Sequence, residues 1–96
     1  MAASRSRIAT LTIGIPLQRA DLPGLVRRTC ALVEDGKVGT LRCEVAGLEA
    51  DAVAVDALAR LALAARRHGC QVRLGRASRD LLALVAFMGL GDVLRG

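Results

Sequence analysis

Few side chains of this 96-residue sequence could carry out a reaction, and their spacing does not bring them together. The single histidine, His68, stands beside arginines at the end of an expected helix, where positive charge suits the helix dipole. Asp51 and Asp56 lie five residues apart, so on a helix they point to different sides and form no acid–base pair. None of the hydroxyl residues has a base beside it in a nucleophile motif. The sequence therefore predicts a protein that is not an enzyme.

The sequence also contains no motif for binding a metal ion or a cofactor. Cys30, Cys43 and Cys70 show neither Cys-x-x-Cys spacing nor companion histidines, which are typical of zinc and redox sites. Gly89-Leu90-Gly91 fits the end of a helix, and the phosphate-loop pattern of nucleotide-binding proteins is absent. We expect reduced thiols, no metal and no cofactor, in a cytoplasmic protein.

Charge and composition bear on the class of partner. The net charge is +5, but the arginines are scattered, and the only tight pairs are Arg27-Arg28 and Arg66-Arg67. Phe87 is the only aromatic residue, so an aromatic platform for stacking bases is not expected. The longest uncharged apolar stretch is too short to span a bilayer. A solvated basic surface is favoured over a nucleic-acid site, and no membrane span is expected.

Strand and helix signals alternate three times along the chain. Strands are expected at residues 8–15, 38–45 and 70–74, and helices at 22–34, 52–68 and 79–88. The helices would be capped by Asp21, Asp51 and Ser78 and stopped by Gly36, Gly69 and Gly89. Residues 1–7 are expected to form a flexible basic tail before one domain, 8–96. This order predicts an α/β fold, a mostly parallel sheet of about four strands with helices packed on it.

Three segments resemble STAS domains, the small α/β modules of bacterial anti-sigma-factor antagonists. They are residues 43–48 followed by Asp51, residues 64–74, and Ser78 with the apolar run that ends in Gly89-Leu90. Together they cover roughly residues 8–94 in the order of that family. The resemblance implies a STAS-like fold and a regulatory role in transcription through binding of another protein.

The sequence departs from that family at its switch. The family's Asp-Ser-Ser-Gly reads Asp51-Ala52-Val53-Ala54 here, with Val53 at the phosphorylated serine. Ile15-Pro16-Leu17-Gln18 replaces the family's Gly-x-Leu-Asp, and the N-terminal hairpin is shortened. We therefore expect the scaffold without control by phosphorylation at this place.

The resemblance places the partner contact on the loop and helix start that follow the second strand. The expected partner-binding residues are Leu48, Glu49, Asp51, Ala52, Val53, Asp56 and Arg60. At about 100° per residue, one stripe of the helix faces the sheet: Ala54, Leu58, Leu61, Ala62 and Ala65. The opposite stripe holds Val53, Asp56, Arg60, Leu63 and Arg67. Its two apolar residues are either isolated exposed side chains, which are ordinary, or part of a contact.

The last helix is apolar nearly all round, so it is either buried on several sides or covered by another chain. A second interface is expected at Leu82, Ala86 and Phe87, in a homodimer or with another protein. The expected partner is an anti-sigma factor of the kinase-like type. The alternative is a small STAS subunit bound to the ATPase of a lipid-transport ABC system, and a basic nucleic-acid binder is the third possibility.

Overall fold

A computed structural model describes residues 7–91 and 94–95 of the chain. Its elements, in chain order, are β1 (Arg7–Thr12), the 3-10 helix η2 (Arg19–Asp21), α1 (Leu22–Val33), β2 (Val38–Glu44), α2 (Ala52–Arg67), β3 (Gln71–Gly75), α3 (Arg79–Phe87) and β4 (Leu94–Arg95). Arg7, which was expected in the N-terminal tail, is the first residue of β1. The other expected tail residues, 1–6, lie outside the described part of the chain.

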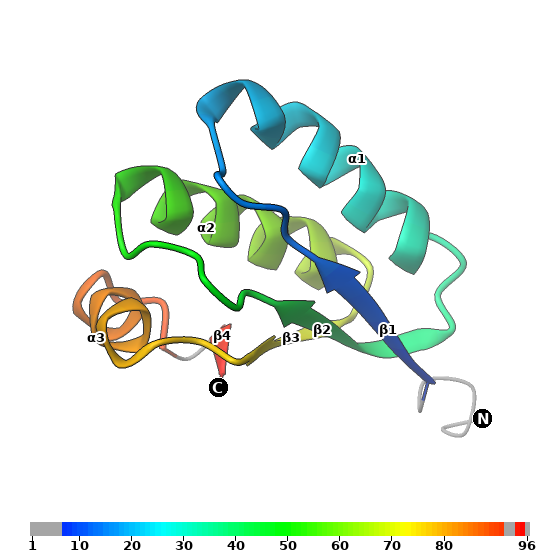
Figure 1. The fold of residues 1–96 in the computed structure, drawn as a ribbon. Coiled ribbons are helices and arrows are strands. Elements are labelled where there is room, and N and C mark those ends of the chain that lie inside the picture. The colour runs from blue at the N-terminus through cyan, green and yellow to red at the C-terminus, as the bar shows by residue number, and fades with distance from the viewer. Residues whose placement is uncertain (1–6, 92–93, 96) are drawn as a thin grey trace.

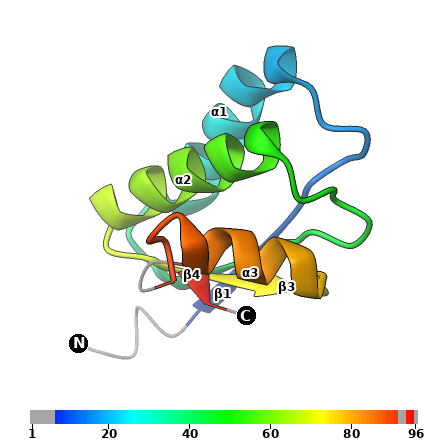
Figure 2. The same ribbon diagram turned by 90° about the vertical axis from the view of Figure 1, so that its left-hand side faces the viewer.

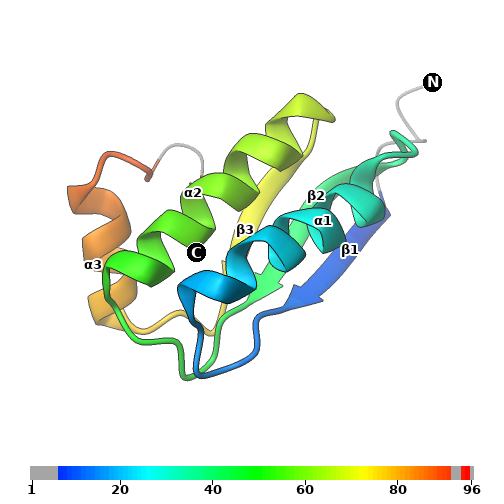
Figure 3. The same cartoon turned by 90° about the horizontal axis from the view of Figure 1, so that it is seen from above.

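The strands form one parallel sheet in the order β1-β2-β3-β4. The α/β class and the parallel sheet are confirmed, but among the described residues three strands have five residues or more, and β4 has two. Strands that are adjacent in sequence are also adjacent in the sheet. Crossovers of one hand then bring the helices to one side. Figures 1 and 3 show α1 and α2 over a single face of the sheet.

The last helix, α3, does not lie over the same face of the sheet as α1 and α2. Figures 1 and 2 show α3 at the β4 end of the sheet, beside it rather than above it. Two of its side chains, Leu81 and Val85, are buried in the core, while its remaining flanks stay outside. The core between sheet and helices is mainly aliphatic, with Leu41, Leu58 and Leu61 fully covered, and it also contains Thr29, Cys43 and Cys70.

Alternation along the strands decides which side chains enter this core. The alternating buried side chains are Leu11 in β1 and Ile13 after it, Leu41 and Cys43 in β2 and Val45 after it, and Val72 and Leu74 in β3. Val38, the first residue of β2, is buried as well. The five helix residues expected to face the sheet, from Ala54 to Ala65, are all buried. The amphipathic reading of α2 is therefore confirmed.

Two details at the start of the chain were predicted wrongly. The first strand ends at Thr12, although Ile13 N still donates to Glu44 O at 3.0 Å, and Ile15 lies exposed in the following loop. Asp21 does not cap α1. Its backbone is already helical, and its Oδ2 accepts from Gln18 N at 2.9 Å, so the carboxylate closes the 3-10 turn instead.

The other helix boundaries agree with the sequence. Asp51 accepts a hydrogen bond from Ala54 N at 2.9 Å, and Ser78 Oγ accepts one from Leu81 N at 3.1 Å. Gly36, Gly69 and Gly89 adopt positive φ after their helices, as expected. Cys70 precedes β3 instead of lying in it.

Candidate functional site

The loop after β2 and the first turn of α2 form the surface where a partner contact was expected. Val45 N donates to Gly75 O at 3.0 Å, and Leu48 N donates to Val45 O at 3.0 Å, which closes a turn. Gly47 completes the turn with φ +78, and a Cβ there would lie 2.8 Å from Ile15 Cδ1. Only glycine meets both conditions without strain. The turn therefore brings the loop after β1 against the loop after β2.

These two loops enclose a shallow hollow of about 370 Å³ at the carboxyl ends of the strands. Its lining comprises Ile15, Pro16, Leu17, Gly47, Leu48, Glu49 and Asp51. The hollow lies outside the carboxyl ends of β1 and β2, the end at which open α/β sheets bind ligands, although the order of these strands does not reverse here. The hollow is lined mainly by aliphatic side chains, with two carboxylates at one side. It suits an apolar side chain of a protein partner better than a small polar ligand.

An ion cluster ties the first loop to α2. Asp56 accepts from Arg60 Nε at 2.8 Å and from Arg19 Nη1 at 2.9 Å. The hydrogen bond from Arg60, followed by the charges of both arginines and the bond from Arg19, lowers the pKa of Asp56 below its ordinary value. Asp56 and Arg60 are four residues apart on α2, as suits an ion pair on one helix face, and Arg19 joins them from a distant part of the chain. Because these groups are largely exposed, the cluster orients the loops more than it stabilises the fold.

The predicted partner-binding residues divide by exposure. Glu49, Asp51, Ala52 and Arg60 are exposed, and Asp56 is half-buried. Leu48 is a correction, because its side chain is only 6% exposed and belongs to the core. It anchors the loop from below, and its small exposed part contributes to the lining of the hollow.

Val53 also differs from its expected place on the solvated stripe. It is half-buried and packs against the core. Leu63 on the same stripe is 54% exposed, as expected. A partner that binds at the helix start could therefore contact the whole side chain of Ala52 but only the exposed part of Val53.

Sequence reasoning missed the contribution of the first loop. Ile15 is 56% exposed at the rim of the hollow, and Leu17 packs partly against the core beneath it. Arg19 was read only as one of many scattered charges. The available signal was an Ile-Pro-Leu run directly after a strand of a parallel sheet, at the edge where binding sites form.

The second predicted surface lies on α3. Phe87, the only aromatic residue, is 84% exposed, and Leu82 and Met88 are 37% and 54% exposed. Ala86 is exposed beside them. The helix therefore presents an apolar flank as expected, and Met88 belongs to it although the sequence did not single it out.

The remaining reactive residues stay apart. His68 is the C-cap residue of α2. Burial, with a smaller contribution from the charge of Glu44, raises the pKa of the Cys43 thiol to about 12. Within the described residues, no group of three or more His, Cys, Asp or Glu side chains could hold a metal ion. The helices in that same part of the chain are all too short or too polar to cross a membrane.

Comparison with known proteins adds no family. No family model matches the chain, and no curated protein matches it either. The interpretation of the site therefore depends on the geometry described above.

Proposed function

We propose that this chain is a STAS-like regulatory domain that acts by binding another protein through the start of α2. The observation that carries the proposal is the surface where the two loops meet. The hollow there is lined by Ile15 and Leu17 of the first loop and by Leu48, Glu49 and Asp51 of the second. Exposed Ala52 and half-buried Val53 follow Asp51 directly at the start of α2. An apolar centre with a charged border is the usual arrangement of a protein interface.

The helix start lacks a hydroxyl that could accept a phosphate, which supports a partner contact that is constitutive and not switched by phosphorylation. Residues 48–57 contain no serine, threonine or tyrosine. Phosphorylation at the place of the family's switch is chemically impossible here. The binding state would then be set by the abundance of the two partners and by their affinity, in the manner of a simple equilibrium.

The partner proposed first is an anti-sigma factor of the kinase-like type, in keeping with the resemblance to anti-sigma-factor antagonists. The second candidate is the ATPase of a lipid-transport ABC system, and the exposed flank of α3 favours it. A permanent subunit needs a large apolar contact. Leu82, Phe87 and Met88 extend the available apolar surface beyond the helix start.

A matched pair of substitutions on α2 tests the proposed site. Ala52→Glu adds a charge at an exposed position of the first turn, where an acid also suits the helix dipole, so the fold should be retained. At a desolvated contact the same charge would be buried without a partner, which costs several kcal/mol. Leu63→Glu is the control, since it makes an equivalent change at an exposed position near the other end of the same helix.

Tagged wild-type and variant proteins are used as baits in extracts of the native host, and captured proteins are identified by mass spectrometry. We expect a partner that is retained by wild type and Leu63→Glu and lost with Ala52→Glu. A kinase-like anti-sigma factor supports the first candidate, and an ABC ATPase supports the second. A partner retained equally by both variants contradicts the proposed site, and phosphate found within residues 48–57 after incubation with a kinase contradicts the constitutive contact.

A further inference from the structure

The sheet has a second face that no helix of the described residues covers. α1 and α2 both lie on one side of the sheet (Figure 1). Because successive side chains of a strand alternate between its faces, those between the core residues point to the other side. These are Ile8, Thr10 and Thr12 in β1, Thr40, Arg42 and Glu44 in β2, and Gln71, Arg73 and Gly75 in β3. We call these nine residues the open sheet face.

The open sheet face carries mainly polar side chains and a net positive charge. Apart from Ile8, which is 66% exposed, it carries threonines, a glutamine and charged groups. The strand register aligns Thr10 with Arg42 and Arg42 with Arg73, and the backbone register continues from Arg73 to Arg95. Like charges placed directly opposite each other on neighbouring strands are destabilising. Arg42 and Arg73 thus form a charged row that an anionic partner would relieve.

Only one acid lies among these residues, and it holds the arginines in place. Glu44 forms ion pairs with Arg42 Nε and, at 3.6 Å, with Arg76 Nε. Gly75 makes room for it, since a Cβ at this position would lie 2.2 Å from Glu44 Oε2. The carboxylate therefore lies flat over β3, and its contacts with Nε leave the Nη groups of both arginines as donors.

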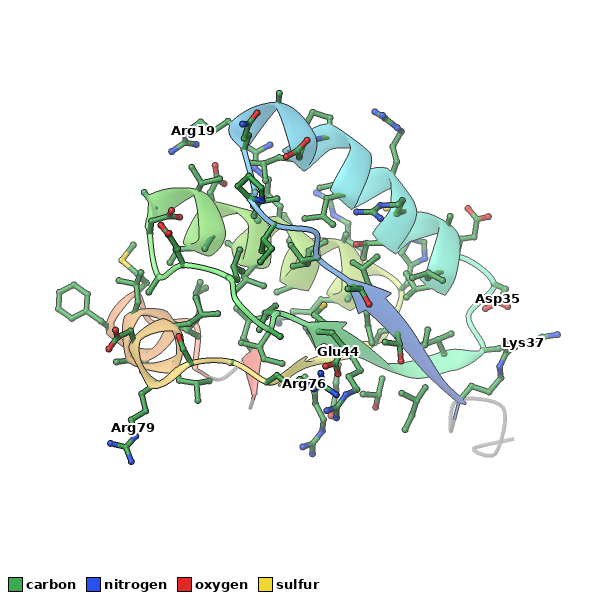
Figure 4. All side chains as sticks on the ribbon, in the orientation of Figure 1. Arg19, Asp35, Lys37, Glu44, Arg76 and Arg79 are labelled. Atoms are coloured by element: carbon green, nitrogen blue, oxygen red, sulfur yellow. The ribbon has the colours of Figure 1, made fainter. Side chains whose placement is uncertain are left out.

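The positions of these groups are visible in Figure 4. Glu44 and Arg76 lie on the side of the sheet away from α1 and α2, and Arg79 of α3 points to the same side. Arg76 follows β3 with φ +59, a conformation uncommon for a residue other than glycine. Beside them is a hollow of about 500 Å³, lined in part by Thr10, Thr12 and Arg42. Hydroxyl and guanidinium donors thus converge on one place.

Arg73 adds a charge that no acid of the described residues pairs with. No salt bridge of the described residues involves Arg73, whereas Arg42 and Arg76 share one carboxylate. Arg42, Arg73 and neighbouring Arg76 stand against one carboxylate, Glu44, so two positive charges remain in excess on this side of the sheet before Arg79 is counted. Guanidinium groups pair with carboxylates through two parallel hydrogen bonds, which gives such pairs geometric specificity.

We propose that the open sheet face docks an acidic segment of a protein partner, one that carries both carboxylates and aliphatic side chains. Carboxylates match the arginine row and the threonine hydroxyls, and an aliphatic side chain matches exposed Ile8 at the margin. A nucleic acid fits less well, because the face contains no aromatic side chain on which bases could stack. This docking surface lies on a different side of the molecule from the start of α2 and does not rest on the function proposed there.

The experiment measures binding by fluorescence anisotropy with two labelled probes. One is a twelve-residue peptide of alternating glutamate and leucine, and the other is a single-stranded oligothymidylate of the same length. Arg73→Glu is the test variant, and it should fold because it places an acid opposite Arg42. Arg67→Glu is the control, an equal change of charge at an exposed position of α2.

At low salt we expect the peptide to bind wild type and Arg67→Glu with similar affinity, and Arg73→Glu to weaken binding by about tenfold or more. Added salt should weaken binding of the peptide to wild type. Failure of the peptide to bind, or an equal loss in both variants, overturns the proposal. Tighter binding of the oligothymidylate than of the peptide also overturns it and identifies the face as a nucleic-acid site.

Discussion

Asp51→Ala tests whether the hydrogen bond that starts α2 forms in solution. The Asp51 carboxylate accepts from Ala54 N at 2.9 Å, and Asp51 has the extended backbone typical of an N-cap residue, with φ −131 and ψ 179. Alanine leaves that amide without its partner. Ala54 itself is fully buried, so the first turn cannot move away to find other partners. The substitution should cost about 1 kcal/mol of unfolding free energy.

For a domain of this size that loss corresponds to a melting temperature about 4–8 °C lower. Asp51→Ser supplies the matched control, because serine caps helices nearly as well as aspartate while removing the charge. Circular dichroism melts of the three proteins, combined with urea titrations, give both quantities. If the serine variant falls as far as the alanine variant, the carboxylate acts through its charge and the capping argument is wrong. An unchanged alanine variant would mean that the cap does not form.

Three further predictions concern other parts of the molecule. Asp56 has a lowered pKa in the folded state, so its stabilising contribution is present above the ordinary value of 3.8 and is lost as the pH falls through the folded pKa. The melting temperatures of wild type and Asp56→Asn should therefore differ at neutral pH and converge in acid. A difference that stays constant with pH would contradict this. Cys43, with a pKa near 12, should resist iodoacetamide at pH 8 in the folded protein and react after denaturation, as peptide mass mapping would reveal; labelling in the native protein would contradict its burial. Leu82→Lys changes a 37% exposed position of α3. It should lower any self-association seen by light scattering and change the melting temperature little. A strongly destabilised variant would instead place that side chain in the core.

The sequence specified the fold where local chemistry and periodicity agreed. Asp51 and Ser78 cap their helices, and the stripe from Ala54 to Ala65 is buried, because capping and amphipathic spacing are local properties. The end of the first strand was misplaced because Ile13 and Ile15 continue an apolar alternation that the backbone abandons after Thr12. A pattern of side chains does not reveal where neighbouring strands cease to pair.

The candidate site was predictable only in part, for a related reason. Residues near the start of α2 could be ordered by helical angle, yet Leu48 and Val53 were placed on the surface although tertiary packing covers them wholly or partly. The contacts of Asp56 with Arg19, and of Glu44 with Arg76, join residues more than thirty positions apart. Which distant side chains meet depends on the order of the strands, and periodicity carries no information about that order.

The strand order has a consequence for how the chain reaches its fold. Each strand pairs with the next one in sequence, so no strand has to enter between two that are already joined. The β1–β2 and β2–β3 pairings each close a loop of roughly 30 residues, for which the entropy cost changes only slowly with length. A nascent chain could therefore build the sheet from its first strand outward during synthesis. The two residues of β4 would join last, when Leu94 completes the core.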